Sequence, residues 1–406
     1  MENKLVILIL TIISICIVYY YLYHYKSKGI LNNRIKNKLS NDMNDIKLYY
    51  QHHESKINKI TKSVLNDLNF KHTYKLKHDW LLYIPKNYNY VELELVDIKP
   101  HNQHQLIYAI KGCDSLCSKN QLWFNLKTKY GRDIAKTLIP ETFNLNDTDD
   151  INIFKTLYIL NKNTNINTNN NNNNNNTNVF ILKKNIQGKK GLLLVNNSVK
   201  ALREGKLNNF KIIQKYIPNP FTINNRKLNL RLYVVIICYQ GKQEWLLFKE
   251  GKCIYTNKRY DKDNSLRDDY IADKEQHFTS LNLDIDKVYL DEALPESLEE
   301  LQTYLGNSKY NFVMDNILNI LQKIKTVYLT KLGKLNTLKQ NKCFQLFGID
   351  FLMDEHLKPY LLEFNKGPSM GIKSPKDKEL KTNVITSIFN YCLFNNYQKD
   401  KLITIT

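Results

Sequence analysis

Residues 344–369 read FQLFGIDFLMDEHLKPYLLEFNKGPS, with an apolar run on either side of a polar turn. This pattern predicts a β-hairpin, and the turn sets its register. In that register Asp350 faces Glu363 with Cβ atoms roughly 5 Å apart, while Asn365 lies opposite Gly348. Facing carboxylates repel each other unless a cation or a proton lies between them. Because such oxygen ligands suit Mg²⁺, the hairpin predicts either a magnesium site or a slipped pair of strands whose carboxylates face water.

The same register predicts which hairpin side chains enter the core. It pairs Met353 with Tyr360 across the turn. It also places Tyr360, Leu362 and Phe364 on one face of the second strand, with Glu363 on the other. The polar face would then carry the candidate metal ligands.

Composition limits the class of partner. The chain has 406 residues, of which 43% are apolar, enough for two or three domains with cores. Its 59 basic and 39 acidic side chains give a formal net charge of +20. This charge indicates an acidic partner, which could be nucleic acid, an anionic membrane or an acidic polypeptide. The seven cysteines are scattered, so we expect free thiols in a reducing compartment rather than a zinc site.

The first segment is apolar. Residues 5–23 carry no charged side chain, and as a helix they would span about 28 Å, enough for a transmembrane anchor. A cleaved signal peptide is the alternative, but the apolar run is long and no small-residue cleavage site follows. Basic residues gather after the run, so we expect a single-pass membrane protein whose catalytic domain lies on the cytoplasmic side. Residues 24–73 are polar and would form a stalk.

A first folded unit is expected at residues 74–160. Strands are predicted at residues 80–84, 91–96 and 105–110. A helical stretch is predicted at residues 123–138. The Asn-rich tract at residues 161–178 has too few apolar side chains to form a core. We therefore expect it to be a disordered surface loop.

Two later segments could bind a polyphosphate. The predicted strand at residues 179–184 leads into a basic loop bracketed by glycines, Gly188–Gly191. Glycine permits close approach and lysine neutralises charge, although solvated Lys-Gly hairpins are common. In the second segment Lys227, Asn229 and Arg231 alternate with leucines and so share one face of a strand. That row could face phosphate or carboxylate groups, or form salt bridges at the surface.

Together these segments resemble the tubulin–tyrosine ligase family of tyrosine ligases, polyglutamylases and polyglycylases. The resemblance covers residues 112–394. It rests on the order and spacing of LWFNLKTKYGRDIAKTLIPETF (122–143), FILKKNIQGKKGLLLV (180–195), IIQKYIPNPFTINNRKLNLRLYVVI (212–236), HFTS (277–280) and FQLFGIDFLMDEHLKPYLLEFNKGPSM (344–370). It implies an ATP-grasp fold of the α+β class with antiparallel sheets, following the N-terminal transmembrane helix. The central and C-terminal subdomains would be residues 179–217 and 218–396, after an N-terminal subdomain at 74–160.

The resemblance also implies roles for single residues. Lys227 and Arg231 match the basic pair that faces the γ-phosphate and the reacting carboxylate, and Asp350, Glu363 and Asn365 match the Mg²⁺ ligands. Lys183 matches the lysine that contacts the phosphates, and Thr279 matches a threonine that contacts ATP. The mobile loop above the phosphates corresponds to Gly188, Lys189, Lys190 and Gly191. The adenine hinge corresponds to Gln214, Lys215, Tyr216 and Ile217.

The chain departs from the family pattern at three positions. Asn229 stands where the family usually has an aspartate, and Ser280 where it usually has an asparagine. Tyr255 stands in place of a further arginine. These changes leave ATP and Mg²⁺ binding as the expectation but bear on activity and on which amino acid is added.

The resemblance implies a ligase that uses ATP and Mg²⁺ to join a free amino acid (Tyr, Glu or Gly) to a protein carboxylate through an acyl phosphate. A Glu-rich tubulin tail or another acidic protein as acceptor would explain the charge of +20, and we expect a monomer. The alternative is a catalytically weakened, membrane-tethered protein that binds microtubules or another acidic polymer. Nucleic-acid binding is disfavoured because the chain lacks an aromatic–basic binding motif.

Overall fold

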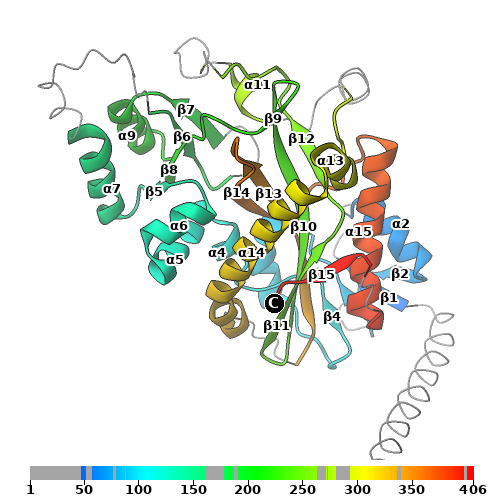
Figure 1. The fold of residues 1–406 in the computed structure, drawn as a ribbon. Helices are drawn as coiled ribbons and strands as arrows, with labels where there is room; N and C mark the ends of the chain where they lie inside the picture. Colours follow the sequence, from blue (N-terminus) through cyan, green and yellow to red (C-terminus); the bar gives the residue numbers. More distant parts are fainter. Residues whose placement is uncertain are drawn as a thin grey trace, which may run out of the picture.

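A large twisted sheet forms the centre of the molecule (Figure 1). The computed structural model describes residues 47–51, 57–75, 79–86, 88–160, 178–186, 191–262, 271, 273–279, 293–335, 340–396 and 400–406. The strands of the large sheet are β1 (Lys47–Tyr50), β2 (Phe70–Thr73), β3 (Leu82–Tyr83), β4 (Leu106–Ile107), β9 (Thr222–Ile223), β10 (Arg226–Tyr239), β11 (Lys242–Phe248), β12 (Lys252–Tyr255), β13 (Cys343–Met353), β14 (Pro359–Lys366) and β15 (Leu402–Thr404).

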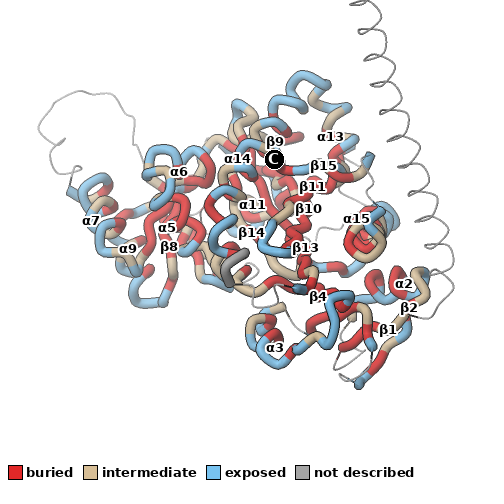
Figure 2. Tube along the Cα trace, turned by 90° about the horizontal axis from the view of Figure 1, so that it is seen from below, coloured by how far each residue is buried: buried red, intermediate tan, exposed pale blue. Residues whose placement is uncertain are grey.

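Strands β10 and β13 are the spine of this sheet. The order across it is β15–β11–β10–β13–β4–β3–β1–β2, with β9 and β12 also paired to β10 and β14 paired to β13. Strands β10 and β13 run antiparallel from the pair Asn229 and Leu352 to the pair Cys238 and Cys343. Both strands are buried almost throughout, whereas the exposed residues gather on the outer loops and on parts of the surrounding helices (Figure 2).

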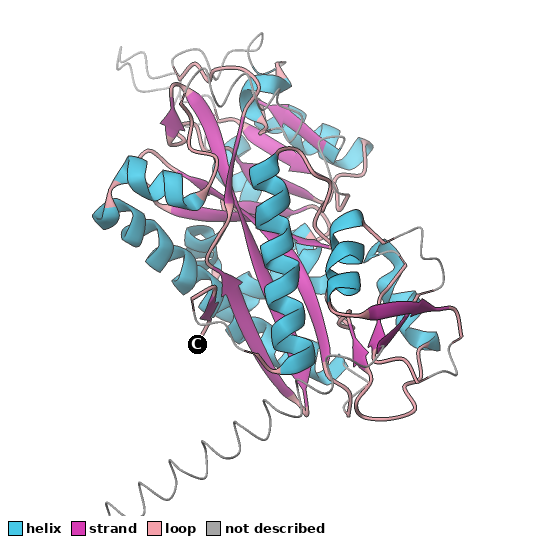
Figure 3. Cartoon of the chain, turned by 90° about the vertical axis from the view of Figure 1, so that its right-hand side faces the viewer, coloured by secondary structure: helices cyan, strands magenta, loops and turns pink. Residues whose placement is uncertain are grey.

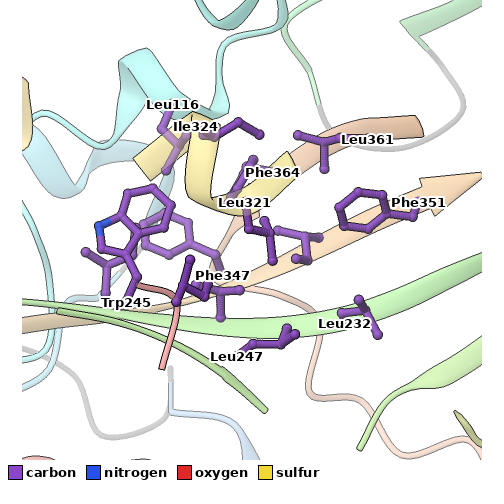
Figure 4. Packing of buried hydrophobic residues seen from close by; sticks show 14 of the residues in the cluster. Leu116, Leu232, Trp245, Leu247, Leu321, Ile324, Phe347, Phe351, Leu361 and Phe364 are labelled. Atoms are coloured by element: carbon purple, nitrogen blue, oxygen red, sulfur yellow. The ribbon is translucent and has the colours of Figure 1, made fainter. Parts of the chain in front are cut away.

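Helices cover both faces of the large sheet. On one face lies the long α14 (Asn307–Leu335), whose Leu321 and Ile324 pack over Phe347 of β13 and Phe364 of β14 (Figure 4). On the other face, α15 (Pro375–Phe394) runs along the strands (Figure 3), with α2 (Lys59–Asp67) beside it. The remaining helices around this sheet are α3 (Val91–Asp97), α4 (Asp114–Cys117), α5 (Lys119–Tyr130), α6 (Arg132–Leu138), α11 (Lys274–His277) and α13 (Leu298–Leu305).

A smaller sheet forms a second layer of structure. It contains β5 (Thr142–Asn144), β6 (Phe180–Lys183), β7 (Leu192–Val195) and β8 (Ile212–Lys215), in the antiparallel order β5–β8–β6–β7. The helices α7 (Thr148–Lys155) and α9 (Ser198–Leu207) pack on it, with a π-helical turn, Thr156–Leu160, after α7. Its core includes an aromatic cluster of Phe143, Phe154, Tyr158 and Phe180. Strand β6, which lies between β8 and β7, ends at Lys183, one of the predicted site residues.

The N-terminal part corrects the expected arrangement of sheets. Strands β1, β2, β3 and β4 pair in parallel and continue through β4 onto β13, so they extend the large sheet instead of forming an antiparallel sheet of their own. Residues 47–73, expected in the stalk, contain β1, α2 and β2. Residues 91–96, expected as a strand, begin α3, because Val91 and Leu95 lie one helical turn apart and enter the core together.

The fold class needs a second correction, at the N-terminus. The expectation included a membrane-spanning helix at residues 5–23 before the ligase fold. In the described part of the chain no helix is long and apolar enough to cross a membrane, and residues 5–23 lie outside that part, as do 161–177 of the Asn-rich tract. The described residues therefore form a mixed α/β, sheet-rich fold, in which no membrane-spanning helix takes part.

Candidate active site

The predicted pairing of the two hairpin carboxylates is confirmed. Asp350 on β13 lies opposite Glu363 on β14, and Gly348 lies opposite Asn365. The Asn365 amide Nδ2 donates a hydrogen bond to Glu363 Oε1 at 3.0 Å. Asp350, Glu363 and Asn365 therefore meet at one end of the hairpin, on the face predicted for them.

The register prediction is wrong on the turn side of these residues. A β-bulge follows Asp350, so Met353 pairs with Pro359 instead of Tyr360. The bulge leaves Leu362 as the extra residue and exchanges the faces, so that Leu361 lies in the core with Phe364. The turn is shorter by one residue than the alternation suggested, and the bulge absorbs this difference without moving the polar end of the hairpin.

Each hairpin carboxylate has a cation from a distant part of the chain. Arg231 lies opposite Asp350 in the pairing of β10 with β13, and its guanidinium donates Nε to Oδ1 and Nη2 to Oδ2, the latter at 2.8 Å. Lys119, the first residue of α5, places Nζ 3.1 Å from Glu363 Oε2. The two carboxylates are thus neutralised by protein cations in this structure.

The two carboxylates differ in their electrostatic environment. Burial raises the pKa of Asp350, and repulsion from Glu363 adds to this, while Arg231 opposes it. Burial also acts on Glu363, but Lys119, Lys183 and the Asn365 amide outweigh it and lower the pKa of Glu363 to about 2. Glu363 therefore stays ionised, and with the oxygens of Asp350 and Asn365 it offers the hard donor set that Mg²⁺ prefers. The residues present fit a magnesium ion.

Two buried lysines lie close to this centre without a carboxylate partner. Among the described residues, neither Lys183 at the end of β6 nor Lys227 on β10 forms an ion pair. Burial lowers the pKa of Lys183 to about 8, partly offset by Glu363. Burial and the charge of Lys183 lower the pKa of Lys227 to about 7. The phosphates of a nucleotide could supply the negative charge that the ammonium groups of Lys183 and Lys227 need when they are protonated.

The expected adenine hinge, Gln214 to Ile217, begins within the last two residues of β8. The Gln214 side chain points into the small sheet, where its amide donates to Thr142 Oγ1 at 2.8 Å. Lys215 is exposed, Ile217 is half-buried, and the Lys215 and Tyr216 backbone N–H groups donate to carbonyls within the protein. An adenine ring would therefore have to form its hydrogen bonds with other backbone groups of this segment.

Tyr216 joins the hinge to Lys227. The Lys227 ammonium lies 4.6 Å from the centre of the buried Tyr216 ring, a cation–π contact. The Tyr216 hydroxyl lies 3.0 Å from Nδ1 of His277, at the end of α11. Tyr216 thus lies between Lys227 and His277, and all three side chains are buried.

The glycine-bracketed loop is described at one position only. Gly188, Lys189 and Lys190 lie outside the described residues. At Gly191 a Cβ atom would come within 2.6 Å of the Ile186 side chain, so the backbone passes too close for any other residue without a shift.

The departures from the family pattern fall on two different faces. Asn229 faces the site, and its Nδ2 donates to Thr279 Oγ1 at 3.1 Å, while its Oδ1 is buried without a partner among the described residues. Tyr255 lies on the opposite face of β12, buried in the core, and donates to the Pro295 carbonyl at 2.9 Å. The interpretation of Tyr255 as a site residue is therefore wrong. Ile254 pairs with Asn229, and Lys252 pairs with Arg231.

Sequence reasoning missed Lys119, Lys252 and His277 as neighbours of the site. Lys119 is the first residue of α5 and follows a polar segment, with no local feature to distinguish it from a surface lysine. Alternation along β12 would have shown that Lys252 and Ile254 share a face, but not which face. Only the pairing of β12 with β10 decides that.

The family membership of this chain follows from a comparison with models of protein families. The model of the tubulin–tyrosine ligase family matches residues 96–401, well over half of the chain. The chain belongs to the tubulin–tyrosine ligase family. The match includes the whole of β10, β13 and β14, and it also includes Lys119 and Lys183.

Several curated members of the tubulin–tyrosine ligase family are similar to this chain. The probable alpha-tubulin polyglutamylase Ttll1 of Tetrahymena thermophila is 26% identical over 281 residues, which cover 68% of this chain and 64% of that protein. The probable tubulin polyglutamylase TTLL9 of Mus musculus is 31% identical over 175 residues, 42% of this chain and 36% of that protein. The tubulin monoglutamylase TTLL4 of Mus musculus is 27% identical over 196 residues, 45% and 16% of the two chains. The chain thus spans less than two thirds of the length of these relatives.

Proposed function

We propose that this chain is an ATP- and Mg²⁺-dependent ligase that joins a free amino acid to a carboxylate of an acidic protein through an acyl phosphate. The acceptor we favour is a tubulin tail, and the amino acid we favour is glutamate. Membership of the tubulin–tyrosine ligase family and the glutamylase names of its relatives support this choice. The net charge of +20 supports an acidic acceptor.

One observation carries the proposal. Lys183 and Lys227 are buried and form no ion pair within the part of the chain that the structure describes, and they lie next to the paired hairpin carboxylates. One of these carboxylates, Asp350, is bonded to Arg231. Lysines of this kind suit the phosphates of ATP, and the oxygen ligands suit Mg²⁺, which would draw charge from the phosphates as it builds up in phosphoryl transfer. A site that binds only a nucleotide would not need Arg231 beside Asp350.

The chemistry follows from the weakness of a carboxylate as an acyl donor. Its leaving group would be oxide, so the carboxylate oxygen first attacks the γ-phosphorus of ATP, with ADP leaving, and an acyl phosphate forms. The amine of the amino acid then attacks the acyl carbon, phosphate leaves, and the amine loses a proton. Lys183 and Lys227 would bind the phosphates, and Arg231 would hold the acyl phosphate and stabilise the oxyanion that follows.

Incorporation of labelled amino acids into tubulin tests the proposal. The full chain is incubated with tubulin, ATP and Mg²⁺ and with labelled Glu, Tyr or Gly in parallel. We expect ATP-dependent incorporation of Glu, and a loss of roughly a hundredfold or more in Glu363→Gln, which removes a ligand charge. The control is Glu355→Gln, because Glu355 is an exposed carboxylate of the same hairpin that pairs with Lys262. If ATP binds but none of the three amino acids is incorporated, the proposal fails.

A binding protein without catalysis is a second candidate, favoured by Asn229. The amide at this position offers no charge, and its nitrogen is already bonded to Thr279. Such a protein would sediment with microtubules equally well as wild type and as Asp350→Ala or Glu363→Ala, with no ligation by any of them. Loss of turnover in these variants from an active wild type would exclude this candidate.

A further inference from the structure

A cavity lies outside the carboxyl ends of the parallel strands of the large sheet. Its volume is about 270 Å³, which is room for roughly nine waters at the density of the liquid. The residues that directly follow β1, β3 and β4 line it, and so do the start of α2 and the segment after β14. The lining thus includes Gln51, Ile84, Tyr108, Thr61 and Pro368.

The strand order makes this place a topological switch point. Strand β1 lies between β2 and β3, and the strands from β1 to β4 pair in parallel. The chain passes from β1 through α2 to β2 on one side, and from β3 through α3 to β4 on the other. Helix α2 packs in the core with α15 and α3 packs in the core with α14, so the two connections cover opposite faces of the sheet. Such a reversal leaves a crevice at the carboxyl ends of the strands, where ligands bind.

One buried polar group of the lining lacks a partner. Gln51 is 1% exposed, and its Nε2 donates to the Pro85 carbonyl at 3.1 Å. Because a carbonyl only accepts, this bond fixes the orientation of the Gln51 amide. The amide oxygen Oε1 is buried and accepts no hydrogen bond from the described residues. A ligand with an N–H donor would supply the bond that a buried acceptor needs.

The charge of the lining favours an acidic ligand. Among the described residues it contains two lysines and no carboxylate. Lys366 pairs with Asp114, whereas the exposed Lys86 forms no ion pair with a described residue. Apolar side chains such as Ile84 and Leu346 form much of the wall. The wall can pack against methylene groups, and Lys86 can pair with a carboxylate at their end.

The segment after β14 connects the cavity to the paired carboxylates. The three residues that follow Asn365 all line the cavity, and the last of them is Pro368. A Cβ atom at Gly348 would come within 2.9 Å of Pro368 and within 3.4 Å of Arg231, so these two side chains lie next to each other over β13. Pro368 therefore borders both the cavity and the site around Arg231.

The distance between the two places suits a polypeptide. Leu346 lines the cavity and lies on the same face of β13 as Asp350, four residues away, which is about 13 Å along the strand. An extended chain advances at most about 3.3–3.6 Å per residue. A polypeptide whose reacting glutamate lies at Arg231 therefore reaches the cavity with a residue about four positions away.

We propose that this cavity binds one acidic residue of the acceptor protein, close in sequence to the glutamate that reacts at Arg231. The proposal rests on the proposed ligase function. A residue of about nine non-hydrogen atoms fills the volume, its backbone N–H donates to Gln51 Oε1, and its carboxylate pairs with Lys86. The acceptor would then cross the carboxyl ends of the parallel strands, and the cavity would select the residue that flanks the modified glutamate.

Filling the cavity tests the proposal. Leu346→Phe enlarges a side chain of the wall in the full chain, and a Glu-rich acceptor peptide, glutamate and ATP are varied in turn. We expect the KM for the peptide to rise roughly tenfold or more, with the other two KM values within about twofold of wild type. Because the ring enters empty space, the free energy of unfolding should not fall, as it would after damage to the fold. Ile385→Phe, on α15, takes its place if Leu346→Phe does not fold.

A scan of the peptide tests the chemistry of the occupant. Each peptide carries one reacting glutamate in a glutamine-rich sequence and a second glutamate about one to five positions away. We expect one placement to lower the KM roughly two- to fivefold, and Lys86→Met to abolish this advantage. Lys71→Met is the matched control, because Lys71 is exposed on β2 and does not line the cavity. A preference that survives Lys86→Met, or no preference at all, overturns the proposal.

Direct binding keeps the cavity testable if the chain is not a ligase. The full chain with Mg²⁺ and a non-hydrolysable ATP analogue is titrated with the labelled Glu-rich peptide. Binding by wild type that Leu346→Phe weakens supports the cavity even without turnover, in which case only the ligase function fails. Ligation by wild type with an unchanged peptide KM in the filled variant overturns the cavity alone. A rise confined to the KM for glutamate, or a wild type that does not bind the peptide, overturns it as well.

Discussion

The two faces of β10 follow different physical rules. On the face toward α14, Leu228, Leu230 and Leu232 are at most 1% exposed and pack against other apolar side chains. On the opposite face Lys227 and Arg231 are also buried or nearly so, but their side chains end in ionisable groups. A buried leucine needs no partner, whereas a buried cation needs an opposite charge or gives up its proton.

The site face of β10 differs from the core face because one of its buried cations needs an opposite charge that a substrate would supply. Arg231 has its partner within the protein, Asp350. Lys227 has none among the described residues, and its pKa falls to about 7 through burial and the charge of Lys183. The core face is held by packing alone, so substitutions on the two faces should differ in kind as well as in size.

The largest effect is expected from Arg231→Met on the site face. It leaves Asp350 buried without its cation, which should lower the free energy of unfolding by about 3–5 kcal/mol. It should also lower turnover by about a hundredfold or more, because the oxyanion loses its donor. Urea denaturation and initial rates of ligation measure the two effects.

The double variant Arg231→Met/Asp350→Asn is the control for this prediction. It removes both charges, so most of the free energy of unfolding should return while turnover stays low. If the single variant is as stable as wild type, the ion pair does not hold the site face.

Leu230→Ala tests the core face of the same strand. The cavity left among Cys253, Phe351 and their neighbours should lower the free energy of unfolding by about 2–5 kcal/mol. The KM values for ATP and acceptor should not change in the folded fraction, since no site residue is altered. Leu230→Met, which nearly conserves volume, should cost less than about 1.5 kcal/mol. An altered KM for ATP in Leu230→Ala would contradict the separation of the two faces.

Proton uptake on ATP binding tests the unpaired lysine. In the free protein Lys227 is largely neutral at pH 8, because burial lowers its pKa to about 7. Phosphates favour the charged amine and raise its pKa, so binding at pH 8 should take up protons, and the uptake should shrink toward pH 6, where the amine is already charged. Calorimetric titration in buffers of different ionisation enthalpy measures the uptake.

Lys227→Met is the matched variant for that experiment. It should remove most of the uptake at pH 8 and weaken ATP binding by roughly tenfold. Uptake that persists unchanged in Lys227→Met would assign the titration to another group, for which Lys183 is the nearest candidate.

The smallest effect is expected from Tyr255→Phe. The lost hydroxyl leaves the Pro295 carbonyl without its donor, which should cost about 1–2 kcal/mol in the free energy of unfolding. Turnover and all KM values should stay at the wild-type level because Tyr255 faces the core. Thermal denaturation and initial rates measure this, and a changed KM for either substrate would return Tyr255 to the site.

Local patterns were sufficient where a short segment determines its own geometry. Alternation in the hairpin predicted that Asp350 faces Glu363 and that Asn365 lies opposite Gly348, because period-two strands and a short turn leave few registers. The same reasoning failed two residues away, since nothing in the sequence announces the β-bulge after Asp350. At residues 91–96 the alternation was misleading, because an i, i+4 pair and a strand-like pattern coincide there.

By itself, the sequence determined the hairpin carboxylates, the polar row along β10 and the family to which the chain belongs, because these depend on residues close together or on motifs in a set order. Only the tertiary structure decided which face of each strand meets the site. The pairing of β12 with β10 turned Tyr255 into the core and brought Lys252 beside Arg231, and α5 brought Lys119 to Glu363. Contacts between segments far apart in the chain are set by the packing of the whole sheet, which no local pattern encodes.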